Sequence, residues 1–426
     1  MTAYLNALGV ICALGNDKTE IARNLSAGES PGMLDDGGWV VGRHFPVGTV
    51  LGELPAIPDS VGANLLASDL TRNVRQNASR TSSLLQGSAT EYRSRNNQLL
   101  MAAALQIEGD IQDAIKRYGP GRIGVILGTS TSGIDEASSG LAVYLREQQF
   151  PPEYDYRQQE LGAPANFLAA WLQLVGPAYV ISTACTSSAR ALLSARRLLD
   201  MGICDAVLCG GVDTLCRLTM NGFSALEALS EQRCNPFSSQ RNGINIGEAA
   251  ALFLMTRESS GSNPIALLGA GASSDAHHIS APEPNGRGAR EAMQKALLSA
   301  DLTADAIGYL NLHGTATPHN DAMESIAVNA VFPSGVPCSS TKPLSGHTLG
   351  AAGALEAAFC WLSLAADNTR QALPPHLWDG QPDPQLPALE WVKPGQCLPQ
   401  PHPRRLMSNS FAFGGNNISL IIGDAP

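Results

Sequence analysis

Two stretches of this chain follow one pattern: a short strand, a tight polar turn and a long helix rich in alanine. The first is residues 180–199, VISTACTSSARALLSARRLL, and the second is residues 340–364, STKPLSGHTLGAAGALEAAFCWLSL. From residue 263 the chain starts again with a strand, a helix and a strand. Two similar βαβ-type halves placed face to face bury their helices between them. The repeat predicts an α/β body of five layers, αβαβα, with halves at residues 1–257 and 258–426.

Hydrophobic periodicity and turn residues assign the other segments. Residues 3–14 predict a first strand and residues 19–26 a helix. Residues 97–117 have helical spacing and basic residues in the last turn, which predicts one long helix. Residues 29–62 are rich in Gly, Pro and Asp and show little periodicity, and we expect them to form a long surface excursion.

Composition excludes several classes of function. The net charge is −10, which argues against general nucleic-acid binding. No stretch is long and apolar enough to cross a bilayer. The nine cysteines form no CxxC pair and are odd in number, which favours a reducing compartment and a cytoplasmic location. The glycine pair in AVLCGG is not followed by a phosphate-binding pattern, so no nucleotide site is predicted.

Cys185 lies in the turn of the first repeated stretch, near the N-terminus of its helix. There the unpaired backbone N–H groups and the helix dipole favour a thiolate over a thiol. On local sequence alone, an inert core cysteine is the favoured interpretation. Other motifs in the chain favour a nucleophile.

Four motifs, in order along nearly the whole chain, resemble the β-ketoacyl-[acyl carrier protein] synthases. They are TACTSSA around Cys185, NLHGTATPHND at 311–321, STKPLSGHTLGAAGALE at 340–356 and SNSFAFGGNN at 408–417. This family condenses thioesters in fatty-acid and polyketide assembly. The resemblance implies the thiolase fold, so we expect the two halves to form one body.

The resemblance also implies roles for particular residues. Cys185 would hold the acyl group, while His313 and His347 would be neutral hydrogen-bond donors to the malonyl thioester. Lys342 and Glu356 would order the site, and the backbone N–H groups of Phe413 and Cys185 would form the oxyanion hole. Phe413 also matches the family's gating phenylalanine, and we call its turn, residues 412–417, the gate turn. The family form GFGGTN is AFGGNN here, so Ala412 and Asn416 leave the range of the gate's motion open.

We expect no cofactor beyond the phosphopantetheine arm that arrives on the acyl carrier protein. Thr315 and Thr317 match the positions that bind this arm. The carrier is acidic, so the densest basic stretch of the chain is a candidate for docking it. This stretch comprises Arg72, Arg75, Arg80, Arg93 and Arg95. A solvated basic surface with no partner explains the same stretch about as well. No metal site is predicted, because His277 and His278 lack ligands at suitable spacing.

Several motif residues distinguish between the classes of protein that share this fold. A degradative thiolase needs a second cysteine where this chain has Phe413, and an initiating synthase carries Asn in place of His347. A non-catalytic chain-length factor lacks the nucleophile, which is present. Members work as homodimers or as heterodimers with such a factor, through the region of residues 140–176, and the sequence leaves both open. The segment at 29–95 is least like housekeeping synthases, which suggests a polyene or polyketide substrate.

Overall fold

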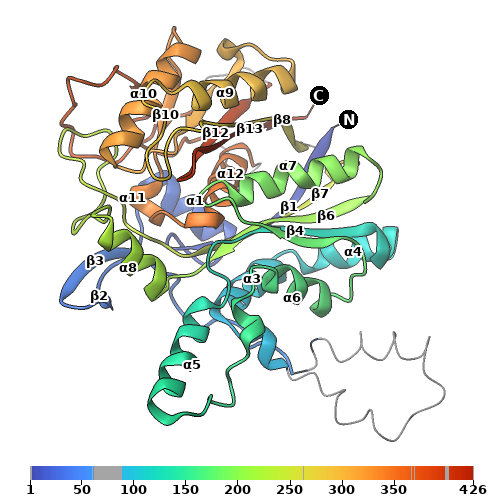
Figure 1. Cartoon of the computed structure of the whole chain (residues 1–426). Coiled ribbons are helices and arrows are strands. Elements are labelled where there is room, and N and C mark those ends of the chain that lie inside the picture. The colour runs from blue at the N-terminus through green and yellow to red at the C-terminus, as the bar shows by residue number, and fades with distance from the viewer. Residues whose placement is uncertain are drawn as a thin grey trace, which may run out of the picture.

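The computed structural model describes residues 2–59, 61, 89–261, 263–365, 367–368, 370–398 and 403–425. One continuous sheet of 11 strands runs through the molecule (Figure 1). Its two halves join where β1 (Ala3–Cys12) pairs with β8 (Ile265–Ser274) through only two residue pairs, Ala3 with Leu267 and Tyr4 with Ala266. The narrow junction makes each half a largely separate sheet.

The order of strands confirms the internal repeat. The N-terminal half runs β5-β4-β6-β7-β1 and the C-terminal half runs β10-β9-β12-β13-β8, with β11 added outside β10. In each half the first three strands in this order are parallel to one another, and each of the last two is antiparallel to the strand before it. The remaining strands are β4 (Ile123–Gly128), β5 (Ala178–Ile181), β6 (Ala206–Asp213), β7 (Ala249–Thr256), β9 (Tyr309–Asn311), β10 (Pro337–Ser339), β11 (Glu390–Trp391), β12 (Arg405–Phe411) and β13 (Asn416–Asp424).

The helices of the two repeated stretches form the central layer. These are α7 (Ser187–Asp200) and α12 (Ala352–Leu364), which pack against each other and against strands of both halves. In α12 every residue except Trp361 is buried, because the helix is covered on all sides. The outer layers are α3 (Arg95–Leu105), α4 (Glu108–Tyr118) and α6 (Ala163–Trp171) on one face, and α9 (Arg287–Ala300) and α10 (Pro318–Val331) on the other (Figure 1). The five-layered thiolase fold is confirmed.

In two segments the local structure differs from, or adds to, what the sequence predicts. Residues 97–117 form two helices, α3 and α4, because the backbone departs from the helical conformation at Ile107 (φ −124°, ψ 23°). Just before this break, the side chain of Gln106 bonds the main chain of Val10 in β1, at 2.8 and 3.2 Å. Residues 29–62 contain a hairpin of β2 (Met33–Val40) and β3 (Arg43–Gly48). Phe45 of this hairpin is buried against Met220 of α8 (Arg217–Ala225), a long-range contact that local composition does not reveal.

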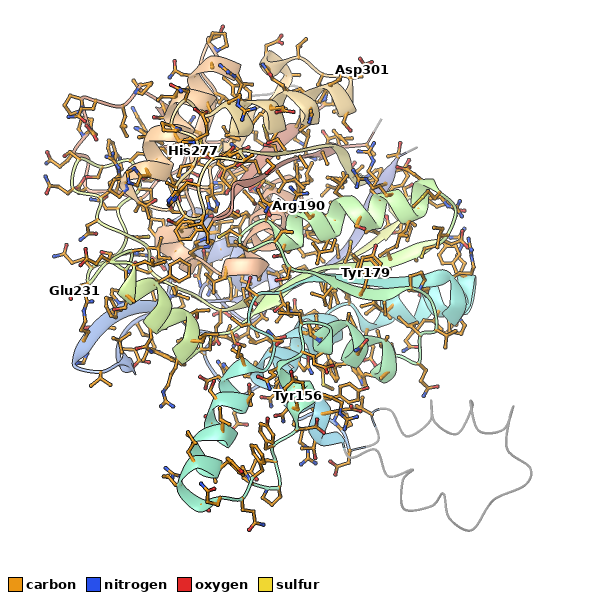
Figure 2. The ribbon with its side chains drawn as sticks, viewed as in Figure 1. Tyr156, Tyr179, Arg190, Glu231, His277 and Asp301 are labelled. Atoms are coloured by element: carbon orange, nitrogen blue, oxygen red, sulfur yellow. The ribbon has the colours of Figure 1, made fainter. Side chains whose placement is uncertain are left out.

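Among the described residues, no helix is both long and apolar enough to span a membrane. All nine cysteines are free, and eight of them are buried. Figure 2 shows the side chains, with Tyr156 in the lower part of the view and Asp301, which ends α9, in the upper part.

Candidate active site

The turn between β5 and α7 presents Cys185. Ala184 has φ +51°, a left-handed conformation that is strained for alanine, and so turns the chain sharply before the cysteine. The hydroxyl of Ser187 braces this turn by accepting from the Thr183 N–H at 2.9 Å and donating to the Ala184 carbonyl at 2.5 Å. Cys185 is 7% exposed and lies at the floor of a cavity. The position near a helix N-terminus is as predicted.

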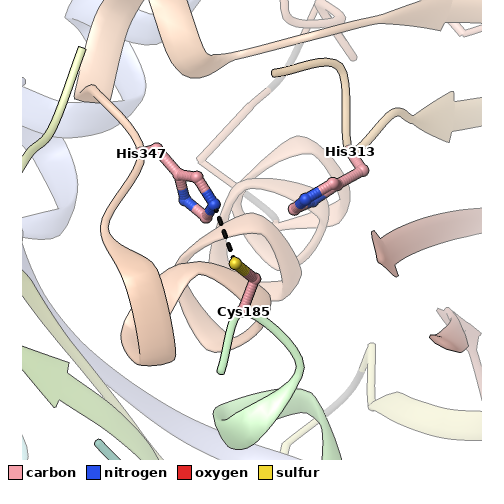
Figure 3. Close-up of side chains that lie close together, drawn as sticks. All are labelled: Cys185, His313 and His347. Atoms are coloured by element: carbon pink, nitrogen blue, oxygen red, sulfur yellow. Dashed lines mark hydrogen bonds between the residues drawn. The ribbon is translucent and has the colours of Figure 1, made fainter. Parts of the chain in front are cut away.

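Two histidines from the C-terminal half face this sulfur (Figure 3). His313 follows β9, and its backbone N–H and that of Gly314 donate to the carboxylate of Glu324 at 2.8 and 2.7 Å. His347 follows α11 (Lys342–Ser345), and its N–H donates to the Asn245 carbonyl at 2.7 Å. The loops that hold the rings are therefore fixed by hydrogen bonds to buried groups.

The geometry brings the three predicted catalytic side chains together. Nε2 of His347 is 3.0 Å from Sγ of Cys185, and the two rings stand at 84° with centroids 5.3 Å apart. The backbone N–H of Leu349 donates to Nδ1 of His347 at 3.3 Å. Since a neutral imidazole that accepts at one nitrogen carries its proton on the other, His347 presents Nε2–H to the sulfur.

Lys342 and Glu356 lie behind His313 as a buried ion pair. The Lys342 ammonium donates to the carboxylate of Glu356 and to the carbonyl of His313, and lies 3.4 Å from Nδ1 of that ring. A cation at Nδ1 requires a lone pair there, so His313 also carries its proton on Nε2. Burial raises the pKa of the Glu356 carboxyl to about 6, and Lys342 opposes this rise.

Burial sets the protonation states at the site. It holds the pKa of His313 and that of His347 well below their usual range, and Lys342 adds to both effects, so both rings are neutral. Burial also raises the pKa of the Cys185 thiol to about 12. The charge of Lys342 and the N–H groups of Cys185 and Phe413 lower this pKa but do not overcome burial. The prediction of a resting thiolate is therefore wrong: the resting group is a thiol.

Phe413 lies in the tight turn between β12 and β13. Its backbone N–H points at the Cys185 sulfur, as an oxyanion donor would. The side chain is 38% exposed and packs on Phe223 of α8, with ring centroids 5.8 Å apart. The Gly414 N–H donates to the carbonyl of Ile279 at 2.7 Å, which fastens the turn to a neighbouring loop.

A cavity of about 480 Å³ leads to these groups. Thr315 and Thr317 line it together with Cys185 and both histidines, and their hydroxyls lie 2.9 Å apart. His278 also lies on the wall, where its Nδ1 accepts from backbone N–H groups of its own loop. The two threonines are thus placed where an amide-rich arm would pass.

The predicted docking stretch is only partly described by the structure. Arg93 is half exposed and pairs with the exposed Asp59, and Arg95 pairs with the buried carboxylate of Glu248. Arg72, Arg75 and Arg80 lie outside the described residues.

One cluster among the described residues has ligand atoms close enough for a metal ion, and it is Cys185, His313 and His347, within 4.8 Å of one another. A thiolate and two imidazoles suit Zn²⁺. Here, however, the Nε2 atoms carry protons and the Lys342 ammonium lies alongside, and both oppose a dication. The arrangement suits covalent chemistry at sulfur.

Sequence reasoning missed two residues that hold the site. Glu324 supports the His313 loop, and burial raises its pKa to about 7. Phe223 provides the contact surface for Phe413. For Glu324, the signal in the sequence is an acidic residue within the apolar α10 segment. For Phe223 the sequence offers no signal, because it lies far from the other motifs.

Comparisons with known proteins agree with this geometry. The family model for the N-terminal domain of beta-ketoacyl synthases matches residues 88–260, and that for the C-terminal domain matches residues 265–377. The 3-oxoacyl-[acyl-carrier-protein] synthase 2 of Synechocystis is 31% identical over 345 residues, 75% of this chain and 79% of that protein. The enzyme of the same name from Vibrio harveyi is 32% identical over 364 residues, 78% of this chain and 84% of that protein.

Solved structures extend the match to the full length. One chain of the complex of the ketosynthase ApeO with its chain length factor ApeC, from Xenorhabdus doucetiae, is 46% identical with a TM-score of 0.87, covering 100% of this chain and 98% of that one. The ishigamide ketosynthase/chain length factor has a TM-score of 0.78 at 25% identity, covering 100% and 99%. This chain therefore belongs to the β-ketoacyl-[acyl carrier protein] synthases, acyltransferases that condense thioesters.

Proposed function

We propose that this chain is the catalytic ketosynthase subunit of a heterodimer with a related chain-length factor, and that Cys185, His313 and His347 perform the condensation. The observation that carries the catalytic assignment is the 3.0 Å separation of His347 Nε2 and Cys185 Sγ, beside a second neutral histidine. A chain-length factor without a nucleophile would have no use for this constellation.

The first half of the reaction loads the enzyme. An acyl carrier protein threads its phosphopantetheine arm past Thr315 and Thr317 into the cavity. The Cys185 sulfur attacks the acyl thioester, and the N–H groups of Cys185 and Phe413 stabilise the oxyanion. The carbon–sulfur bond to the carrier breaks, and the proton lost by Cys185 leaves on the carrier's thiol. Because the resting group is a thiol, proton loss accompanies the attack.

The second half extends the chain. The malonyl thioester carbonyl accepts hydrogen bonds from Nε2–H of His313 and of His347. The bond to the carboxylate breaks, carbon dioxide leaves, and the electron pair becomes an enolate that the two donors stabilise. The enolate carbon then attacks the acyl carbonyl on Cys185. The new carbon–carbon bond forms as the Cys185 sulfur departs and takes up a proton, giving a β-ketoacyl carrier two carbons longer.

Intact-mass spectrometry tests this assignment directly. The protein is incubated with a panel of acyl carrier thioesters and then with malonyl carrier protein, with Cys185→Ala as the control. We expect an acyl adduct that is absent in the control and disappears as the longer product forms. An adduct in the Cys185→Ala protein would refute the nucleophile. No adduct from any donor would point to a missing partner subunit or to the non-catalytic alternative.

Exposed apolar side chains support a partner subunit. Seven large hydrophobic residues between positions 141 and 179 are exposed. They are Leu141, Leu145, Phe150, Tyr156, Leu161, Val175 and Tyr179. Six of them lie within residues 140–176, where the family resemblance places the subunit interface, and Tyr179 follows in β5. The outer edge of β5 is unpaired in the described part of the chain, so it offers backbone groups as well. A chain-length factor is favoured as occupant because the ApeO complex contains one.

Other features support a substrate class, a docking site for the carrier and a location for the protein. The likeness to ketosynthase complexes with chain-length factors favours polyketide or polyene elongation over housekeeping fatty-acid synthesis. For carrier docking, the candidates are Arg72, Arg75, Arg80, Arg93 and Arg95, of which Arg95 also pairs with the buried Glu248. Nine free cysteines favour the cytoplasm. A kcat/KM for carrier substrates that is insensitive to salt would contradict docking by arginines.

A further inference from the structure

Asp213, the last residue of β6, is a buried carboxyl that the reaction above does not use. Its side chain is fully buried, and no cation pairs with it in the described part of the chain. Oδ1 accepts four hydrogen bonds, from the hydroxyls of Thr129 (2.6 Å) and Thr131 (2.8 Å) and from the N–H groups of Ser130 (2.7 Å) and Thr131 (2.9 Å). Burial raises the pKa of this carboxyl, and these bonds oppose the rise.

The other oxygen of Asp213 reaches the C-terminal half. Oδ2 accepts the backbone N–H of Gly350. A Cβ at Gly350 would lie 2.8 Å from that oxygen and 2.9 Å from the Ser130 nitrogen, so only glycine permits the approach. The preceding residue, Leu349, is buried and has φ +49°, which is strained for leucine. The hydrogen bond from the Gly350 N–H to Asp213 Oδ2, one residue further on, is well placed to hold Leu349 in this conformation.

Leu349 is the residue whose N–H donates to Nδ1 of His347. The other contacts of His347 hold its main chain: its N–H donates to Asn245, and its carbonyl accepts from Gly247 at 3.0 Å. They do not choose between the two positions of the ring proton. That choice depends on the direction of the Leu349 N–H.

We infer that Asp213 is a positioning residue: by holding the Gly350 N–H it keeps Leu349 in its left-handed conformation, and so keeps the His347 proton on Nε2, facing Cys185. The inference rests on the proposed function, because the reaction uses Nε2–H of His347 as a hydrogen-bond donor. Its test needs no acyl substrate, so failure of the positioning role and failure of the proposed function can be told apart.

Asp213→Asn distinguishes the role of Oδ2, which contacts Gly350, from that of Oδ1. Four donors surround Oδ1, so the amide oxygen takes that place and the NH₂ group faces the Gly350 N–H, donor against donor. The Gly350 contact is lost while the other bonds remain. Thr129→Val is the matched control, because it removes one bond to Oδ1 and leaves Gly350 untouched.

The readout is the rate at which iodoacetamide alkylates Cys185, followed by peptide mass spectrometry from pH 7 to 9. With Nε2–H donating, the thiolate is favoured; with the proton on Nδ1, Nε2 accepts from the thiol and the thiol is favoured. The other ionisable groups that face Cys185 are His313, Lys342 and Glu356, and the substitution leaves them unchanged. We expect Asp213→Asn to shift the profile up by about one pH unit, which is roughly tenfold slower alkylation at each pH.

Alkylation of Asp213→Asn at the wild-type rate would overturn the inference, as would equal slowing in Thr129→Val. Leu349→Gly in the Asp213→Asn background should restore the rate, because glycine adopts φ +49° without strain; no restoration would also count against it. If Asp213→Asn alone did not fold, recovery of folded double variant would support the inference, and a double variant that stayed unfolded would refute it.

Discussion

Each catalytic histidine has its own support at the residue scale. Burial keeps both rings neutral. The proton of His313 is directed to Nε2 by the Lys342 ammonium at 3.4 Å from Nδ1, whereas that of His347 is directed by the Leu349 N–H at 3.3 Å. A charge holds one ring and a strained backbone holds the other. A substitution that disturbs the support of one ring should therefore leave the proton of the other ring in place.

Removing His313 should impair decarboxylation more than loading. In His313→Ala the malonyl carbonyl loses one of its two donors, so we expect release of carbon dioxide to fall by about a hundredfold or more. Loading of Cys185 should persist, because the N–H groups of Cys185 and Phe413 remain. Carbon dioxide release and intact mass measure the two steps. The exposed His277→Ala is the control, and equal losses in both steps would contradict the assignment.

Asn416 is tied to the helix that follows the nucleophile. Arg190 on α7 donates to its Oδ1 at 3.2 Å, and this is a position where the family form has threonine. Asn416→Thr should release the gate turn and speed loading of long acyl chains by roughly fivefold, the contribution of about one hydrogen bond. A time course of acylation, with samples quenched and analysed by mass spectrometry, measures the rate of loading. Arg190→Ala should act equally, and the double variant no more than either; additive effects would exclude a shared contact.

At the element scale, β5 has two roles. Its C-terminal end leads into the Cys185 turn, and its outer edge is unpaired in the described part of the chain. Tyr179 in this strand is 36% exposed, with its hydroxyl 2.7 Å from that of Ser194 on α7. A partner that pairs with β5 would therefore also cover the helix that positions the nucleophile.

A charge on β5 should prevent subunit association without unfolding the chain. Tyr179→Asp places a carboxylate on the edge, and we expect a loss of dimer by light scattering at micromolar concentration. Leu298→Asp is the matched control, since Leu298 is an exposed apolar residue of α9, outside the expected interface. Dissociation by Leu298→Asp, or a dimer that survives Tyr179→Asp, would argue against an interface at β5.

Buried histidines affect the whole molecule through the pH dependence of stability. Burial lowers the pKa of His376 from its usual 6.5 to about 3, so between these values the unfolded chain binds one proton more than the folded protein. The free energy of unfolding then falls as pH falls, by up to about 1.4 kcal/mol per pH unit from this group. In contrast, the raised pKa of Glu324, about 7, makes stability fall as pH rises from about 4.5 to 7.

His376→Gln isolates the contribution of that histidine. Urea unfolding of wild type and variant at pH 4, 5 and 6 should give free energies whose difference changes by about 1.4 kcal/mol per pH unit, with the wild type steeper. The carboxyl groups cancel in this difference. A constant offset between the two proteins would show that His376 does not titrate between folded and unfolded states.

The sequence by itself determined the layered fold and the principal site residues. Cys185, His313, His347, Lys342 and Glu356 lie in short motifs where neighbouring residues fix a turn or a helix start, and such local geometry is visible in the sequence. The two repeated stretches likewise predicted which helices lie at the centre, because an apolar helix must be covered.

Only the tertiary structure decided the features that depend on contacts between distant segments. The thiol state of Cys185 follows from burial by both halves. The bond from Gln106, at the end of α3, to β1 joins distant segments, and so does the packing of the β2–β3 hairpin on α8. Asp213 and Gly350 are 137 positions apart and come from different halves. Desolvation and long-range hydrogen bonds are set by whichever segments the fold brings together, so no local pattern in the chain contains them.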